Sequence, residues 1–362
     1  MKYITIRLAE GVPGEVYHPL VLCTTPVPVP HGREVLVKMA AASLNHRDFF
    51  IRKHLYPGTT DGVPLLSDGA GTVVAVGEAA SPDWLHKRVV INPGSGWKDS
   101  RAGPEAPSGW YSLLGGTKYN DKGTLTEYLT VDEGEIEEAP AHLSDVEAAA
   151  LPVTALTAWR ALVTKAGEEG SGKGATVLVT GIGGGVALMA LKFAIARGAD
   201  VWVTSSSAHK IRRAVELGAR GGVNYREARW PETLLGLLPS ERRRFDAIID
   251  GAGGDIVEKS VQLLKPGGVV VVYGMTLAPK MDFTMKAVLK NIDVKGSTMG
   301  SRKEFRDMIN FVKQSGMRPV VSKVVGGIGN LDAIEGLFQE IGAGNQFGKL
   351  VIKIKPDINS KL

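Results

Sequence analysis

A glycine-rich turn between a predicted strand and a predicted helix constrains the fold of this chain more than any other feature. Residues 180–187 read Thr-Gly-Ile-Gly-Gly-Gly-Val-Ala and follow an apolar run. The strict G-x-G-x-x-G spacing is not met, because a valine stands at its sixth position, but a G-x-x-G-x-x-A reading fits a variant of the same turn. Glycine permits a sharp turn whose backbone N–H groups meet a pyrophosphate at a helix N-terminus. The predicted cofactor contacts are Gly181, Gly183, Gly184, Gly185 and Val186.

Strand and helix patterns alternate around this turn. The expected strands are 175–180, 200–204, 222–225, 245–250 and 268–273. The expected helices are 186–197 and 208–217. This spacing is that of βαβ units, and nearly continuous apolar strands are typical of a parallel sheet covered on both faces. The sequence therefore predicts a doubly wound α/β nucleotide-binding domain.

The N-terminal part of the chain has a different pattern. Short alternating runs such as 34–39 and 71–76 are separated by proline and glycine as far as about Val131, which predicts a mainly β region. Residues 92–120 are rich in Gly, Ser and Trp, lack periodicity, and are longer than a typical connection. Because 362 residues exceed one comfortable core, we expect two domains with a cleft between them.

The residues after the predicted strand 200–204 indicate which nicotinamide cofactor is preferred. Enzymes that prefer NAD usually carry an acid there, which accepts from the ribose 2′-hydroxyl. Here the chain reads Ser205-Ser206-Ser207, followed by Lys210 and Arg213 one helical turn apart. Hydroxyl and cationic donors suit a 2′-phosphate, so we predict NADPH, with Ser205, Ser206 and Lys210 in contact with it. The alternative for Lys210 and Arg213 is a solvated helix face.

Composition excludes several classes of partner. The net charge of +5 could indicate nucleic acid, but the basic residues are dispersed, so we expect no nucleic-acid binding. No stretch approaches the roughly 20 apolar residues of a membrane span, and the N-terminus lacks the apolar core of a signal peptide. Cys23 is the single cysteine, which excludes an intramolecular disulfide and a cysteine-rich metal site. We expect a cytosolic protein that acts on a small-molecule substrate.

Further motifs resemble one known family along nearly the whole chain. They lie at 41–48, 66–71, 123–128, 151–159, 250–253 and 347–351. Together with the glycine-rich turn they resemble the medium-chain dehydrogenase/reductase superfamily, in its zinc-independent quinone oxidoreductase-like branch. The resemblance implies a GroES-like β-barrel catalytic domain over 1–130, completed by 300–362, and a Rossmann NADP-binding domain over 131–299. It also implies a homodimer paired through an edge strand at 294–298.

The resemblance assigns roles to residues of the N-terminal part. Asn45 and Asp48 match residues near the nicotinamide and its ribose, although Asp48 could instead cap or pair locally. Asp68 could order the cleft or touch substrate. Tyr56 matches the second tyrosine of the family pattern and could donate to a substrate oxygen or only pack, whereas Phe50 replaces the first tyrosine. We predict Asn45, Tyr56 and Asp68 as the catalytic residues.

The remaining predicted cofactor contacts follow from the same resemblance. Thr157 and Lys349 match residues on the nicotinamide side, and Tyr225 matches the adenine or 2′-phosphate side. Gly251 and Tyr273, at the ends of two further predicted strands, complete the set.

The resemblance also implies that no metal is present. Zinc-dependent relatives place a cysteine at Asn45 and a Gly-His-Glu run at 67–69, and they carry four cysteines in the loop that corresponds to 92–120. None of these ligands is found in this chain, so we predict no metal site. Without a Lewis acid, charge on a carbonyl oxygen must be met by hydrogen-bond donors or water, which favours an acceptor that is already polarised.

We therefore expect a zinc-independent, NADPH-dependent oxidoreductase that transfers a hydride to a conjugated carbonyl compound, either a quinone or an α,β-unsaturated carbonyl. Two alternatives remain open. One is a metal-free ketone or alcohol oxidoreductase, which would prefer a saturated ketone to its enone. The other is a cofactor-binding protein without turnover, which would bind NADPH tightly and pass its hydride to no acceptor.

Overall fold

The computed structural model describes residues 1–107, 109–241, 243–277 and 280–355. Contacts within these residues divide the chain into two units. Unit 1 is Met1–Val153 with Ser301–Leu362, and unit 2 is Thr154–Gly300. The first boundary therefore lies at 153 rather than at the expected 130. The reason is that the strands of 128–138 pair with strands of unit 1 and belong to its sheet.

Unit 2 is built around a sheet that contains, in the described residues, six parallel strands in the order β12-β11-β10-β13-β14-β15. These strands are β10 (Thr176–Val179), β11 (Asp200–Ser205), β12 (Gly221–Asn224), β13 (Phe245–Asp250), β14 (Leu264–Val272) and β15 (Asp293–Gly296). The order reverses between β10 and β13, as in a doubly wound nucleotide-binding fold. The predicted Rossmann architecture is confirmed.

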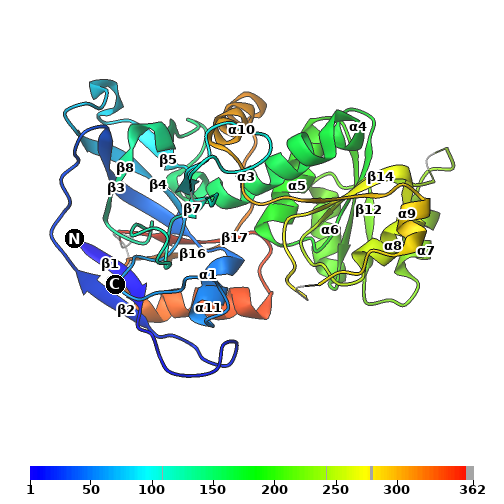
Figure 1. Ribbon diagram of the computed structural model, residues 1–362, viewed down its shortest axis with the longest axis horizontal. Coiled ribbons are helices and arrows are strands. Elements are labelled where there is room, and N and C mark those ends of the chain that lie inside the picture. Colours follow the sequence, from blue (N-terminus) through cyan, green and yellow to red (C-terminus); the bar gives the residue numbers. More distant parts are fainter. Residues whose placement is uncertain (108, 242, 278–279, 356–362) are drawn as a thin grey trace. The chain divides into compact units, whose positions relative to one another are not determined.

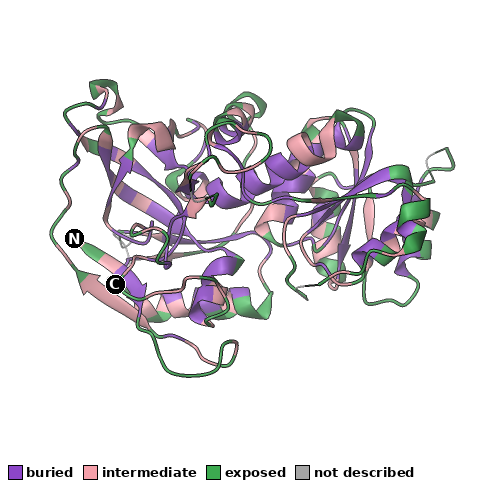
Figure 2. Cartoon of the chain, in the orientation of Figure 1, coloured by how far each residue is buried: buried purple, intermediate pink, exposed green. Residues whose placement is uncertain are grey.

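Helices flank the strands of unit 2 along the chain (Figure 1). They are α3 (Pro152–Trp159), which starts in unit 1, a π-helical stretch (Arg160–Ala166), α4 (Gly167–Ser171), α5 (Gly185–Ala196), α6 (Ala208–Glu216), α7 (Trp230–Leu237), α8 (Ile256–Leu263) and α9 (Met285–Leu289). The central strands β10 and β13 are buried almost throughout, whereas most of the helices have one buried and one exposed face (Figure 2). This burial explains why the strands read as continuous apolar runs.

Unit 1 contains a mixed sheet with the strand order β16-β17-β3-β4-β5-β9 in the described residues, and β8 also pairs with β3. The strands of unit 1 are β1 (Lys2–Ile6), β2 (Leu20–Thr24), β3 (Glu34–Ser43), β4 (Asp68–Val76), β5 (Arg88–Ile91), β6 (Gly94–Ser95), β7 (Ser112–Leu113), β8 (Tyr128–Asp132), β9 (Ile136–Glu138), β16 (Val321–Gly326) and β17 (Lys349–Lys353). The two-residue strands β6 and β7 pair with each other inside the long 92–120 stretch, where the sequence predicted no regular structure.

The C-terminal segment completes the sheet of unit 1. Strand β17 pairs antiparallel with β3, with Val351 opposite Ser43, and β16 pairs with β17. The helices of unit 1 are α1 (His46–Arg52), α2 (Asp145–Ala149), α10 (Arg302–Ser315) and α11 (Leu331–Ala343), and α11 packs on α1. Among the described residues, no helix combines the length and the apolar character that crossing a membrane requires.

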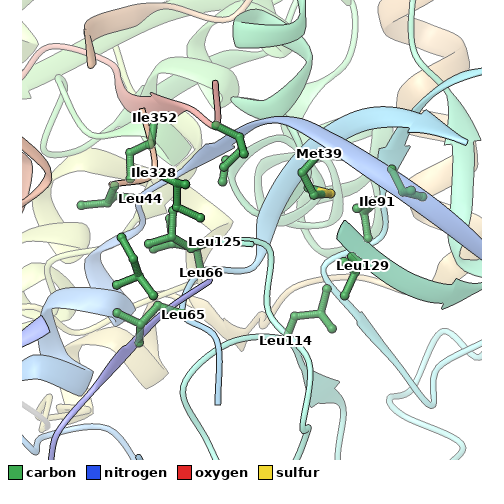
Figure 3. Packing of buried hydrophobic residues seen from close by; sticks show 14 of the residues in the cluster. Met39, Leu44, Leu65, Leu66, Ile91, Leu114, Leu125, Leu129, Ile328 and Ile352 are labelled. Atoms are coloured by element: carbon green, nitrogen blue, oxygen red, sulfur yellow. The ribbon is translucent and has the colours of Figure 1, made fainter. Parts of the chain in front are cut away.

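The core of unit 1 joins segments that lie far apart in the sequence. Leu44, Leu66, Leu125 and Ile352 are each at most 2% exposed and lie close together in Figure 3. Met39, Ile91 and Leu129 continue the same cluster along the sheet and are also labelled in Figure 3. Since Leu44 and Leu66 flank the motifs at 45–48 and 67–68, this packing fixes the backbone from which the predicted catalytic side chains project.

Candidate active site

A buried ion pair lies at one end of the sheet of unit 1. Lys349 opens β17 and Asp68 opens β4, and their side chains are 4% and 0% exposed. Lys349 Nζ donates to Asp68 Oδ2 at 2.6 Å, to Asn45 Oδ1 at 2.7 Å and to the Leu44 carbonyl at 2.7 Å. An ammonium has three N–H donors, and each of these three contacts can occupy one.

The strand register explains why these residues meet. Ser43 lies opposite both Asp68 on β4 and Val351 on β17, so Lys349, two residues before Val351, lies just beyond the end of β3. Asn45 follows there as the N-cap of α1. The predicted residues Asn45, Asp68 and Lys349 are thus brought together, and we call them the buried polar cluster.

The Asp68 carboxylate is saturated with donors. Its Oδ2 accepts from Asn45 Nδ2 at 2.8 Å and from Ser43 Oγ at 3.2 Å, besides Lys349, and its Oδ1 accepts from the Val153 backbone N–H at 2.7 Å. A buried charge is tolerated when it is paired and fully hydrogen-bonded. The arrangement holds Asp68 as a fixed anchor for Asn45 and Lys349.

Asp48 is a second buried carboxyl, one turn into α1. Its Oδ2 accepts from the Asn45 backbone N–H at 2.7 Å and its Oδ1 from Arg47 Nη1 at 3.2 Å. Burial raises the pKa of Asp48 to about 6, although the neighbouring Arg47 guanidinium and the Asn45 N–H oppose the shift. Asp48 thus both caps the helix start and pairs locally. This is the second of the two roles that the sequence analysis left open for Asp48.

Tyr56 is half-buried and packs against the core of unit 1, with its ring 4.6 Å from the Arg47 guanidinium carbon. Phe50 contacts the His46 ring edge-on, at a centroid distance of 4.6 Å. No described residue forms a hydrogen bond with the Tyr56 hydroxyl, so the hydroxyl can serve a ligand.

In unit 2 the glycine-rich turn has the geometry that the sequence predicted. Gly181 and Gly183 have φ values of +63° and +121°, which residues other than glycine rarely adopt. Gly184 is the N-cap of α5, so the N–H groups of Gly185 and Val186 lie in its first turn. These N–H groups lack partners within the helix and are available to an anion.

Lys210 lies against the same turn. A Cβ added at Gly183 would stand 2.8 Å from Lys210 Cδ and 3.3 Å from its Nζ. Burial lowers the pKa of Lys210, a shift that a bound anion would oppose. Ser205 Oγ accepts from the Ser207 backbone N–H at 3.2 Å, and the Ser205 carbonyl accepts from the Tyr225 N–H at 3.2 Å. Ser206 follows directly and is partly exposed.

Asp250, at the end of β13, anchors the start of the glycine turn. Its Oδ1 accepts from Thr180 Oγ1 at 2.5 Å, and its Oδ2 accepts from the Gly253 N–H at 2.7 Å. Burial raises the pKa of Asp250. The Tyr273 ring covers Gly251, where a Cβ would stand 2.5 Å from the ring, so these two predicted cofactor contacts lie together.

Thr157, on α3, is buried and donates to Met299 Sδ at 3.8 Å. Met299 has a φ of +45°, a strained value for a residue that is not glycine, and such strain tends to cluster at functional sites. Thr157 and Met299 are both residues of unit 2.

Comparison with known proteins identifies the family. A model described as alcohol dehydrogenase GroES-like domain matches residues 31–141, and one described as zinc-binding dehydrogenase matches 185–314. The chain is 48% identical to the zinc-type alcohol dehydrogenase-like protein YogA of Leptosphaeria maculans, over 97% of this chain and 99% of that protein. The chain belongs to the medium-chain dehydrogenase/reductase superfamily. It is an oxidoreductase of that superfamily, whose members use NAD or NADP.

Two further similarities bear on its chemistry. The chain is 35% identical to a chloroplast envelope quinone oxidoreductase homolog of Arabidopsis thaliana, over 63% of this chain and 62% of that protein. The solved structure of an NAD-dependent alcohol dehydrogenase superposes with a TM-score of 0.82 at 31% identity, over 98% of this chain and 100% of that one. GroES-like and Rossmann domains, both predicted, are thereby confirmed.

One of the matched family models and the relative YogA carry names that mention zinc. Zinc sites use Cys, His and carboxylate ligands. In the described residues, no three His, Cys, Asp or Glu side chains gather closely enough to hold a metal ion. The Asp68 carboxylate already carries a cation at 2.6 Å, which would repel a second. The residues present do not fit zinc, whereas the glycine turn and Lys210 fit a dinucleotide.

Sequence reasoning missed four members of the site. Ser43 and the Val153 N–H hold Asp68, Thr180 holds Asp250, and Arg47 binds Asp48 and Tyr56. Arg47 had one available signal, since it stands between Asn45 and Asp48, two residues of the same family motif.

Lys349→Met should destabilise the protein by about 3–5 kcal/mol, because it leaves the buried Asp68 carboxylate without its counter-charge. The double variant Lys349→Met/Asp68→Asn should recover part of this loss, because the uncompensated charge is then removed. The measurement is the free energy of unfolding in urea. Lys87→Met is the matched control, because Lys87 and Glu138 pair with side chains 48% exposed, and it should cost at most about 1 kcal/mol. Additive effects of the two buried substitutions would contradict this account.

The buried Asp48 carboxyl should make stability fall as pH rises. Its pKa is raised from 3.8 to about 6, so the folded state binds the proton more tightly than the unfolded state does. The stabilisation is present below the unfolded value and is lost as pH rises to about 6, in total by up to about 3 kcal/mol. The stability of the wild type relative to Asp48→Asn should therefore fall from about pH 4 to about pH 7. Asp61→Asn, at an exposed carboxyl, controls for the lost charge. If the stability of the wild type relative to Asp48→Asn stayed constant or rose with pH, the raised pKa of Asp48 would be wrong.

Proposed function

We propose that the protein transfers a hydride from NADPH to a conjugated carbonyl acceptor, a quinone or an α,β-unsaturated carbonyl, without zinc. The observation that carries this proposal is the buried polar cluster. Where zinc-dependent relatives have metal ligands, this chain has an amide and a carboxylate that are bonded to a lysine ammonium. This supports placing the chain in the quinone oxidoreductase-like branch, as does its similarity to the Arabidopsis homolog.

The cluster contributes to orientation rather than to acid–base chemistry. Lys349 and Asp68 neutralise each other and direct their polar atoms at one another, so neither supplies a free charge to a carbonyl oxygen. An acceptor must then delocalise its own developing charge, as an enone or quinone does. Asn45, fixed by both partners, supports the start of α1, and the Tyr56 hydroxyl is the donor proposed to meet the acceptor oxygen.

The proposed coenzyme is NADPH, which supplies the hydride. The first turn of α5 would hold its pyrophosphate, and Lys210, which lies against Gly183, would meet its 2′-phosphate together with Ser205 and Ser206. The strand β11 ends in serine, and an acid at that position would repel a 2′-phosphate. Tyr225, Gly251 and Tyr273 would line the same end of the sheet, and Thr157 would meet the nicotinamide side.

A second candidate, a metal-free ketone or alcohol oxidoreductase, is favoured by the similarity to an NAD-dependent alcohol dehydrogenase. Oxidation of NADPH followed at 340 nm against matched pairs of enones and saturated ketones, with quinones in parallel, separates the two. The proposal expects turnover with quinones or enones to exceed turnover with the matched ketones. Faster turnover of saturated ketones would favour the alternative, and tight binding without any turnover would indicate a protein that only binds the cofactor.

Lys210→Ala should weaken NADPH binding by about tenfold to hundredfold and leave NADH binding within about threefold, because only NADPH carries the 2′-phosphate. Ser206→Asp should likewise weaken NADPH binding more than NADH binding. Fluorescence titration with both coenzymes is the measurement, and Lys286→Ala, at an exposed lysine of the same unit, is the control. Equal losses of affinity for NADH and NADPH would argue that Lys210 does not contact the 2′-phosphate.

We also propose that the protein is a homodimer joined through β15. This strand lies at the edge of the six-stranded sheet, and near it in sequence Leu277, Phe283, Met285 and Leu289 are between 54% and 75% exposed. Exposed apolar side chains and a strand edge that no other described strand covers are both suited to contact with a second copy. Light scattering should give twice the chain mass for the wild type and for Lys286→Ala, and a lower mass for Leu289→Lys. A monomeric wild type at micromolar concentration would exclude this assembly.

A further inference from the structure

Arg47 is a buried cation at the start of α1, with a side chain 8% exposed. Its Nη1 donates to Ser67 Oγ at 2.8 Å, to the Leu114 carbonyl at 3.0 Å and to Asp48 Oδ1 at 3.2 Å. Its Nη2 donates to the Gly115 carbonyl at 2.9 Å. One guanidinium thus ties together α1, the residue before β4 and the segment after β7, and its plane is fixed by acceptors from all three.

The Arg47 guanidinium carbon lies over the Tyr56 ring, 4.6 Å from the ring centroid. A cation over an aromatic face contributes about 0.5–2 kcal/mol, most where it is shielded from water. Since no described residue bonds the Tyr56 hydroxyl, its orientation depends on what holds the ring. The Tyr56 side chain also packs against the apolar core of unit 1, a contact that is less directional than one with a hydrogen-bonded guanidinium.

We propose that Arg47 is the positioning residue for Tyr56, whose ring it holds in place so that the hydroxyl faces the acceptor. The proposal deepens the proposed function and rests on it only for the role of the hydroxyl. The orienting contact itself is a property of unit 1 and can be tested without turnover.

A lysine at this position should not replace the arginine. Its ammonium is a point charge with three donors, so it cannot meet four oxygens from three segments, and it offers no flat face to the ring. Arg47→Lys therefore keeps the charge beside Asp48 while removing the contact between the guanidinium and the Tyr56 ring. Ser67→Ala is the matched control, because it removes the 2.8 Å contact of the same guanidinium without touching Tyr56.

The first readout is ¹⁹F NMR of the full chain with 3-fluorotyrosine at position 56. A ring held by Arg47 should give a resonance displaced from that of a solvent-exposed fluorotyrosine. Arg47→Lys should move the resonance toward the exposed position, whereas Ser67→Ala should leave it nearly unchanged. An unchanged resonance in Arg47→Lys would overturn the proposal. Arg47→Gln, whose shorter side chain removes both the charge and the contact with the ring, gives the same test if the lysine variant does not fold.

The second readout is a double-mutant cycle on kcat for an enone. Arg47→Lys should lower kcat about tenfold, which corresponds to a partly desolvated cation–π contact, with little change in KM for NADPH. The same substitution should have little further effect in a Tyr56→Phe background, because it acts through the hydroxyl. Equal losses in both backgrounds would overturn the proposal. If Tyr56→Phe alone leaves kcat unchanged, the proposed role of the hydroxyl fails, and the ¹⁹F shift still decides whether Arg47 orients the ring.

Discussion

The ion pair between Lys349 and Asp68 is the interaction on which the rest of unit 1 depends. The two residues are 281 positions apart in sequence, and their side chains are almost completely excluded from water. A buried charge of either sign is costly without its partner, so the pair favours the register in which β17 starts beside the end of β3 and the start of β4. Asn45 bridges the pair and starts α1, and α1 in turn carries Asp48 and Arg47. The strand register that joins this pair therefore also sets the start of α1, from which Arg47 and Asp48 project.

The same pairing limits the chemistry. In a metal-dependent dehydrogenase a doubly charged ion polarises the carbonyl, whereas the Lys349 ammonium of this chain is already paired with the Asp68 carboxylate at 2.6 Å. In the proposed mechanism the cluster therefore orients its own side chains but offers no strong electrophile. This explains why the proposed substrates are conjugated carbonyl compounds, in which the electron pair spreads over several atoms.

The sequence predicted most of unit 2. Its strands are buried on both faces and so read as apolar runs, and its glycine turn needs residues that permit a sharp bend before a helix. It placed Asn45, Asp68 and Lys349 in the site only through resemblance, and it separated Lys349 from the other two, because no local pattern reveals a contact over 281 residues. Arg47 was missed because a charged residue at a helix start is normally solvated, and its burial comes from Leu114 and Gly115 in a stretch without periodicity. The first domain boundary was misplaced because β8 and β9 are short and pair with distant strands.

The central claim is that the buried polar cluster replaces a metal. The most direct test is the metal content of the purified, active protein, measured by inductively coupled plasma mass spectrometry before and after exhaustive chelation, with NADPH-dependent reduction of an enone or a quinone assayed on the same samples. The account predicts zinc far below one atom per chain and full activity after chelation. One zinc per chain, with activity that is lost on its removal and restored on its return, would contradict it.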